Sequence, residues 1–206
     1  MTEPHLDWRA VAARAASLLL RYPDEQTLDA LPLIEAALPE LPAEVADPIA
    51  TLAGYRASVH PRELAAEYVQ LFDFRRRSAL HLSYYTAGDT RRRGEALVGF
   101  VAAYKAAGVE VVGGELPDYL PAVLDLAAVH VGGWRLLRAN RIGLDLLDKA
   151  LAGSPYRHAI AAVRAMLPPP DAADLAAAAT LARTGPPMEQ VGLEGFGLVD
   201  TTGGRR

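Results

Sequence analysis

The chain contains no cysteine. This absence excludes disulfide bonds, thiolate metal sites, iron–sulfur ligation through the protein's own side chains and cysteine catalysis. The histidines are scattered, without the i, i+4 pairing or carboxylate neighbours of a metal-binding motif. They are His5, His60, His81, His130 and His158. We therefore expect structural or exposed histidines rather than a metal centre.

The sequence also lacks the short motifs of common enzymes. No glycine-rich phosphate loop follows a predicted strand, and no serine lies in a nucleophile elbow. Asp145 and Asp148 lie three residues apart on a predicted helix. Surface salt bridges with Arg138, Arg141 and Lys149 explain these acids better than paired catalytic carboxylates do. We therefore predict that the protein is not an enzyme.

Long hydrophobic runs are missing as well. No uncharged apolar segment approaches the roughly 20 residues that span a bilayer, and the N-terminus lacks the basic start and apolar run of a secretory signal. The chain has 21 Lys and Arg against 25 Asp and Glu, a net charge of −4, which disfavours nucleic acid as a partner. We expect a cytoplasmic protein that meets the membrane only indirectly, through another protein.

What the sequence does contain is helical periodicity over most of its 206 residues. Trp8, Val11 and Leu18 mark a first helix with Asp7 as its cap. Further helices are expected over residues 24–38 with a bend at Pro32, 43–59, 62–74, 90–107, 118–131, 134–151, 155–167 and 171–183. Short turns are expected over 75–88, and Gly132 and Gly133 are expected to separate two of the helices.

Long helices with short connections indicate the all-α class. We predict one helical bundle without a sheet over residues 1–184. From residue 185 the composition changes to Gly, Pro and isolated apolar residues, which predicts a flexible C-terminal tail over 185–206.

The three arginines Arg91–Arg93 lie where helix physics disfavours cations. They fall in the first turn of the predicted helix 90–107, at the positive end of its dipole, whereas Arg75–Arg77 follow a helix, where cations are favourable. The first group therefore calls for an acidic partner or an anionic ligand. Alternatively, its side chains extend into water or pair within the fold, with Asp73 and Asp89 as candidate partners.

An apolar helix ending in Leu71-Phe72-Asp73 lies near these basic and aromatic residues in the sequence. Such a combination suits a groove for a peptide helix, in which apolar faces bury the peptide and fixed charges orient it. Tyr68, Leu71 and Phe72 equally suit the centre of the fold. Core packing is the favoured interpretation for these three.

Three ordered motifs carry a resemblance to a known family. They are Glu67-Tyr68-Val69-Gln70-Leu71-Phe72-Asp73, the segment from Tyr84-Tyr85 through Gly88-Asp89-Thr90-Arg91-Arg92-Arg93-Gly94, and Glu115-Leu116-Pro117-Asp118-Tyr119-Leu120-Pro121. With Leu19-Leu20-Arg21-Tyr22-Pro23 near the start, the chain resembles the NarJ-type assembly chaperones of respiratory nitrate reductase. These belong to the TorD-like group of redox enzyme maturation proteins.

The resemblance implies an all-helical cytoplasmic chaperone of the TorD-like type. Its implied partner is the apo catalytic subunit of respiratory nitrate reductase, bound through its N-terminal peptide and its body. The chaperone supports insertion of the molybdenum guanine dinucleotide cofactor before membrane docking, binds no cofactor stably itself and is not part of the final enzyme. The absence of cysteine agrees with this role.

The resemblance also marks the residues that we predict to bind the client or to define the motifs. These residues are Tyr68, Leu71, Phe72, Asp73, Tyr84, Tyr85, Gly88, Asp89, Thr90, Arg91, Arg93, Leu116, Pro117, Asp118, Tyr119 and Pro121. Two alternatives remain open. The Arg91–Arg93 cluster could bind nucleotide phosphates at a helix N-terminus, or the protein could be a general adaptor for several redox enzymes.

Overall fold

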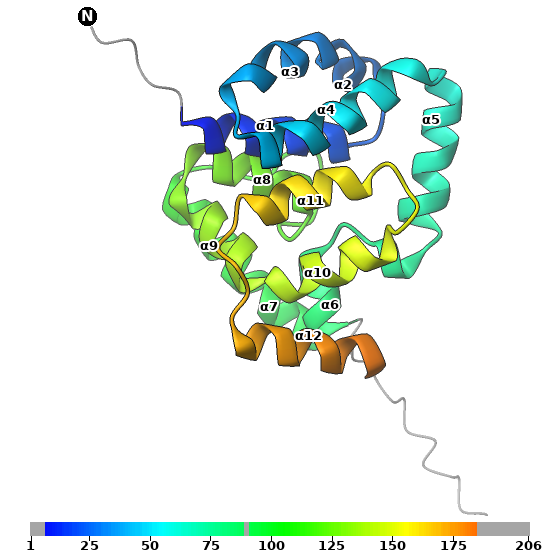
Figure 1. Cartoon of the computed structure of the whole chain (residues 1–206). Helices are drawn as coiled ribbons and strands as arrows, with labels where there is room; N and C mark the ends of the chain where they lie inside the picture. The colour runs from blue at the N-terminus through cyan, green and yellow to red at the C-terminus, as the bar shows by residue number, and fades with distance from the viewer. Residues whose placement is uncertain (1–6, 89–90, 185–206) are drawn as a thin grey trace, which may run out of the picture.

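The computed structural model describes residues 7–88 and 91–184, and within these ranges the chain is helical (Figure 1). The described part contains no strand, and its one isolated β-bridge joins His81 to Tyr119. The predicted all-α class is confirmed. The predicted C-terminal tail lies outside the described residues.

The helix bounds follow the chain from the N-terminal to the C-terminal end. The α-helices are α1 (Trp8–Leu20), α2 (Glu25–Asp29), α3 (Leu31–Ala37), α4 (Ala43–Ser58), α5 (Pro61–Tyr68), α6 (Leu82–Ala87), α7 (Arg91–Ala107), α8 (Leu120–Val129), α9 (Val131–Ala139), α10 (Arg141–Ala150), α11 (Arg157–Ala165) and α12 (Ala172–Thr184). The 3₁₀ turns cover Leu38–Glu40 and Arg76–Ser78, and a π-helical turn covers Val69–Asp73.

Helix α1 lies at the centre of the body and packs against α4, α8 and α11. Its alanines make this possible, because short side chains let neighbouring helices approach closely; Ala12, Ala13 and Ala16 are fully buried. The Asp7 carboxylate caps the helix by accepting from the Arg9 amide at 3.0 Å. Leu19 and Leu20, also fully buried, continue the core toward the helix end.

The predicted helix over 134–151 is wrong, because Asn140 divides it into α9 and α10. The Asn140 side chain donates to the Leu136 carbonyl at 2.9 Å, a local bond that competes with helix continuation. The predicted break at Gly132 and Gly133 is also misplaced. Both glycines lie inside α9, and the break falls at His130.

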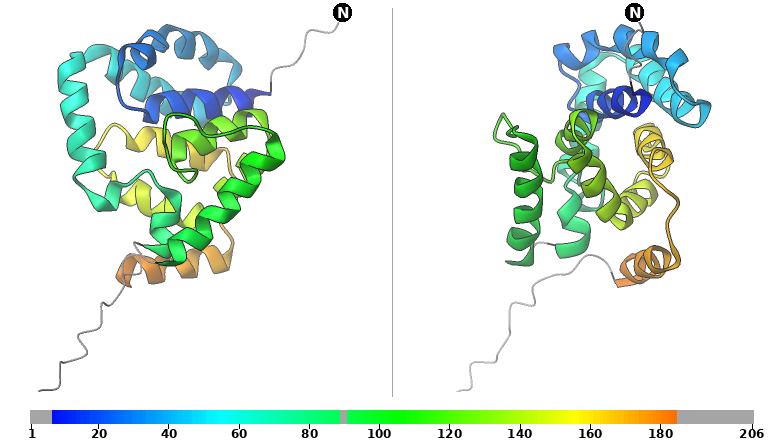
Figure 2. Two further views of the ribbon diagram at one scale, coloured as in Figure 1. Left: turned by 180° about the vertical axis from the view of Figure 1, so that it is seen from behind. Right: turned by 90° about the vertical axis from the view of Figure 1, so that its left-hand side faces the viewer.

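Helices α7 and α12 lie on the outside of the body, as the right-hand view of Figure 2 shows. Helix α7 packs against α6 and α9, and α12 packs against α10. Of the α7 side chains, Phe100 and Tyr104 are buried. No helix in the described part of the chain is long and apolar enough to cross a membrane.

Candidate functional site

The second and third sequence motifs pair through their backbones. The Leu82 amide donates to the Asp118 carbonyl at 2.9 Å, and the Leu120 amide donates to the Leu80 carbonyl at 2.7 Å. These two bonds produce the isolated bridge between residues 81 and 119. The pairing brings segments that are almost 40 residues apart into one site.

The carboxylate of Asp118 is the centre of this site and is fully buried. It accepts hydrogen bonds from the Ser83 hydroxyl at 2.5 Å, the Ser83 amide at 3.2 Å and the His81 Nδ1 at 3.2 Å. Arg93 of α7 places its Nη2 at 3.8 Å from the same carboxylate. We call Asp118, His81, Ser83 and Arg93 the Asp118 cluster. It holds α6, α7 and the start of α8 together.

The electrostatic environment of the Asp118 cluster favours the ionised carboxylate. Burial alone raises the pKa of a carboxyl group, but the hydrogen bonds of His81 and Ser83 and the attraction of His81 and Arg93 outweigh it. The net effect lowers the pKa of Asp118 below the ordinary value of 3.8. Ionised Asp118 therefore stabilises the folded state.

Acidification is expected to remove this stabilisation. Because the pKa of Asp118 is lower in the folded chain, its ionisation stabilises the fold above the unfolded-state pKa of about 3.9, and the contribution is lost as pH falls through the folded-state pKa. Urea unfolding from about pH 7 to about pH 2 measures the effect. The Asp118→Asn protein cannot ionise there, so its deficit in unfolding free energy should shrink on acidification. A deficit independent of pH would contradict the assignment.

The Asp118 cluster also answers the question of what faces the basic entrance to α7. The sequence suggested Asp73 and Asp89, and within the described residues the third motif supplies Asp118 as a carboxylate facing Arg93. Asp73 is exposed and forms no ion pair within the described residues, and Asp89 lies outside them. Sequence spacing could not show this pairing because the partner lies 25 residues beyond Arg93 in another motif.

The first motif ends α5 and turns inward. The Phe74 amide donates to the Val69 carbonyl at 3.2 Å, five residues back, which closes the π-helical turn. Tyr68, Leu71 and Phe72 are 6%, 6% and 8% exposed. These three predicted site residues therefore belong to the core, and Asp73 faces outward.

Tyr68 connects the first motif to the third motif and to α1. Its hydroxyl donates to the Leu20 carbonyl at 3.1 Å and lies 3.1 Å from the Tyr119 hydroxyl. Its ring packs against those of Tyr22, Phe72 and Tyr156 at centroid distances of 5.5, 4.6 and 6.0 Å. Burial, with Tyr119 beside it, raises the pKa of Tyr68 well above its usual range, so the hydroxyl stays protonated.

The other predicted site residues divide by exposure. Tyr85, Gly88 and Pro121 are buried. The Tyr85 hydroxyl donates to the Arg77 and Ala79 carbonyls at 3.0 and 2.9 Å, which fixes the loop before α6. The exposed or half-buried motif residues are Tyr84, Arg91, Arg93, Leu116, Pro117 and Tyr119. Thr90, like Asp89, lies outside the described residues.

Arg56 is a structural residue that sequence reasoning missed. It is 1% exposed, and its Nη1 donates to the Leu18 and Leu19 carbonyls at 3.1 and 2.8 Å. It thereby supplies donors to carbonyl groups in the last turn of α1, where regular helical hydrogen bonds run out. Its Nη2 donates to the Thr27 hydroxyl at 3.1 Å. Burial lowers the pKa of Arg56. The lone arginine of α4 gave no pattern from which this role could be predicted.

The predicted surface ion pairs of α10 are wrong, because both acids are buried between helices. Asp145 accepts from Arg164 of α11 at 2.6 Å and from Arg141 at 3.4 Å. Asp148 accepts from Arg157 at 3.0 and 3.1 Å. The acids therefore join α10 to α11, and Arg141 is the one predicted partner that contacts them.

The described histidines act as helix caps or structural donors, or are exposed. The Nδ1 atoms of His60 and His130 accept from the amides of Arg62 and Gly132, and His158 is exposed. Within the described ranges no three His, Cys, Asp or Glu side chains gather closely enough to hold a metal ion.

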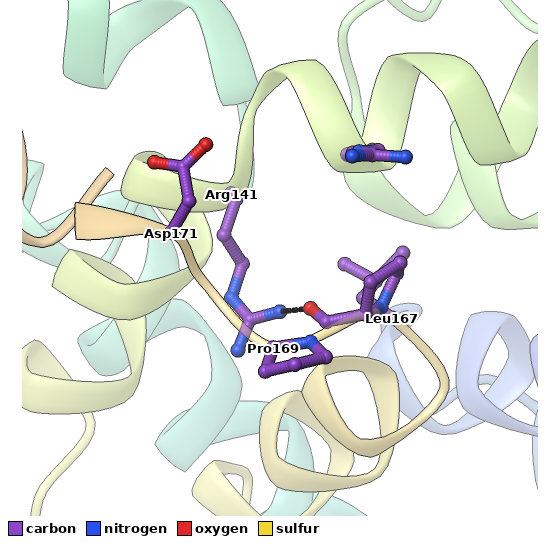
Figure 3. Close-up of a pocket in the computed structure, with 6 residues that line it drawn as sticks. Arg141, Leu167, Pro169 and Asp171 are labelled. Carbon is purple, nitrogen blue, oxygen red and sulfur yellow. Dashed lines mark hydrogen bonds between the residues drawn. The ribbon is translucent and has the colours of Figure 1, made fainter. Parts of the chain in front are cut away.

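A small polar cavity lies between α10 and the end of α11 (Figure 3). The Arg141 guanidinium reaches toward Leu167 and Pro169, and its Nη1 donates to the Pro168 carbonyl at 2.7 Å. The cavity volume is about 40 Å³. This is room for a few water molecules at most, so the cavity has no space for a cofactor.

The fold and the paired motifs define an all-α protein in which many of the motif residues join the helices to one another. The chain belongs to the nitrate reductase delta subunit family, whose family model matches residues 38–167. That range contains all three motifs, and the resemblance inferred from them is confirmed.

Individual relatives agree with this family. The chain is 39% identical over 165 residues to the nitrate reductase-like protein NarX of Mycobacterium tuberculosis, covering 76% of this chain and 24% of NarX. It is 33% identical over 121 residues to the probable nitrate reductase molybdenum cofactor assembly chaperone NarJ of Bacillus subtilis, covering 58% and 66%. It is 33% identical over 119 residues to the assembly chaperone NarJ of Escherichia coli, covering 54% and 49%. The chain thus spans about a quarter of NarX and about half of the Escherichia coli NarJ.

Proposed function

We propose that this protein is an assembly chaperone that binds the apo catalytic subunit of a respiratory nitrate reductase, including its N-terminal segment. It supports insertion of the molybdenum cofactor and delays membrane docking until insertion is complete. The observation that supports this function is the family match over residues 38–167, together with relatives named as molybdenum cofactor assembly chaperones. The chaperone itself acts in the cytoplasm and is not an enzyme.

The protein assists cofactor insertion without holding the cofactor stably. An all-helical body joined by buried polar contacts, such as the Asp118 cluster, supports a role in presenting a fixed surface to a client. Such a surface binds without paying a large ordering cost. The membrane is reached indirectly, through the client.

We propose that the motif residues have two roles, one in holding the fold and one in contacting the client. Buried residues such as Tyr68, Phe72 and Asp118 hold the scaffold. Client contact falls to the motif residues that solvent reaches, above all Arg91 and Leu116, both of which are exposed. A partner can reach and desolvate exposed side chains, whereas it cannot reach buried ones.

Loss of this protein is expected to leave the catalytic subunit without molybdenum. In a deletion strain, the subunit should be synthesised but contain little metal, and a plasmid copy of the gene should restore the metal content. Elemental analysis of the purified subunit measures the effect. The control is a plasmid that carries a Glu110→Lys variant. Glu110 is exposed and lies outside the three motifs, so this variant should restore the metal content as the unchanged gene does. Full molybdenum content in the deletion strain would refute the proposal.

A further inference from the structure

Helix α7 has an apolar face that no other helix of the described chain covers. Phe100 and Tyr104 face the body and are buried, whereas Val98 and Val101 on the other side are 66% and 40% exposed. The right-hand view of Figure 2 shows α7 at the edge of the molecule, with no helix on its outer side. Exposed apolar side chains grouped on one helix face are typical of an interaction surface.

Small and charged residues complete this face. Its exposed members, which we call the outer α7 face, are Gly94, Glu95, Val98, Val101, Ala102, Lys105 and Ala106. A Cβ atom added at Gly94 would have no neighbour within 4 Å. Neither Glu95 nor Lys105 forms an ion pair within the described residues. A partner helix can therefore approach closely and find both charges available.

The order of residues on the outer α7 face is complementary to itself. In two copies of α7 that pack antiparallel about a two-fold axis at the level of Phe100, residues equally far before and after position 100 lie at the same height. The pairs are then large with small, acidic with basic and small with small: Val98 with Ala102, Glu95 with Lys105 and Gly94 with Ala106. Each pair occurs twice, because the same face is used by both copies.

The charges of α7 select the antiparallel arrangement over a parallel one. A parallel pair would place Glu95 beside Glu95 and Lys105 beside Lys105, and like charges at an interface repel. It would also bring the two basic entrances of α7 together. In the antiparallel pair the two Arg91 residues lie about 27 Å apart along the helix axis, at 1.5 Å per residue, and the helix dipoles are opposed.

From this pattern we infer that the outer α7 face binds a second copy of this chain and forms a symmetric, antiparallel dimer. The inference does not depend on the proposed function. Helix α7 has 17 residues, about 25 Å of helix, so the contact is smaller than a standard interface of about 800 Å² per partner. We therefore expect a weak dimer that dissociates in the micromolar range.

Sedimentation of the full chain tests the inference. Over about a hundredfold range of protein concentration, the average mass should rise from that of the monomer toward that of the dimer. Glu95→Lys and Lys105→Glu each place like charges opposite one another at two points of the interface, so each should weaken the dimer by about tenfold or more. A chain that stays monomeric at every concentration would overturn the inference.

Two further samples test the pairing of Glu95 with Lys105. An equimolar mixture of the Glu95→Lys and Lys105→Glu proteins places opposite charges at both points and should dimerise again, as should the double variant that carries both changes. Glu35→Lys is the matched control, because it changes the net charge equally at an exposed position of α3. Thermal unfolding checks that each variant is folded. Dimers weakened equally by Glu95→Lys and Glu35→Lys would overturn the inference, and so would a double variant without recovery.

The molybdenum assay keeps this inference apart from the proposed function. If the wild-type chain is monomeric while its gene restores molybdenum to the deletion strain, the dimer alone is refuted. If the chain is monomeric and a Glu95→Lys gene also fails to restore the metal, the outer α7 face is assigned to the client and the dimer is overturned. A dimer that follows the charge pattern supports the inference even if the deletion strain matures its enzyme normally, a result that refutes only the proposed function.

Discussion

Replacing Gly133 with alanine is expected to destabilise the protein by about 3 kcal/mol, near the upper end for overpacking. The reason is the close crossing of α8 and α9. A Cβ atom at Gly133 would lie 2.2 Å from the Ala127 amide nitrogen and 2.4 Å from its Cα. Backbone atoms of a packed helix cannot move aside as a flexible side chain can, so the helices must separate. Thermal unfolding should show a midpoint about 10 °C lower.

Gly99 provides the matched control on α7. An added Cβ there meets nothing within 4 Å, and alanine is favoured over glycine inside a helix by about 0.5–1 kcal/mol. Gly99→Ala should therefore leave the protein as stable or slightly more stable. Similar midpoints for Gly133→Ala and Gly99→Ala would show that the helix crossing is looser than the structure indicates.

Replacing Asp118 with alanine is expected to cost about 3–5 kcal/mol of unfolding free energy, the range for removing one partner of a buried charged network. The substitution leaves the Ser83 hydroxyl and amide and the His81 ring without their acceptor, and it removes the carboxylate facing Arg93. Urea unfolding at neutral pH measures the loss. We further expect the contacts of α6 and α7 to loosen first, seen as faster amide hydrogen exchange in these helices.

The same substitution at Asp125 tests whether burial is responsible. Asp125 also pairs with two cations, Arg14 and Arg21, but its side chain is 25% exposed and theirs are 55% and 36% exposed. Solvent-exposed ion pairs contribute about 0–1 kcal/mol. Asp125→Ala should therefore cost far less than Asp118→Ala. A comparable loss at the two positions would refute the special role assigned to the buried carboxylate.

Most helices could be predicted because local signals decide them. Asp7 caps α1, and apolar side chains recur at the period of a helix. The helical pattern gave a wrong prediction where a side chain forms a hydrogen bond to its own backbone. The apolar periodicity over 134–151 is continuous, but the Asn140 side chain donates to the preceding turn and α9 ends there. The π-helical turn over Val69–Asp73 had no local signature either, because the inward packing of Leu71 and Phe72 favours it.

The sequence predicted which motifs make up the candidate site, but not how their side chains are arranged in space. The sequence suggested Asp73 and Asp89 as partners of the arginines; Asp73 faces outward, and the fold places Asp118 of the third motif opposite Arg93. The buried Arg56 belongs to no motif. Sequence motifs report which residues belong to the family, but not which of them solvent or a client can reach.

The sequence by itself determined the helical class, the positions of most helices and the family, because these depend on local propensity, periodicity and ordered motifs. The tertiary structure alone decided which motif residues are buried and which charges meet. It also decided that short alanines on α1 and α3 leave an apolar groove between these helices. The physical reason is distance along the chain: burial, ion pairing and concavity arise between helices that are far apart in sequence.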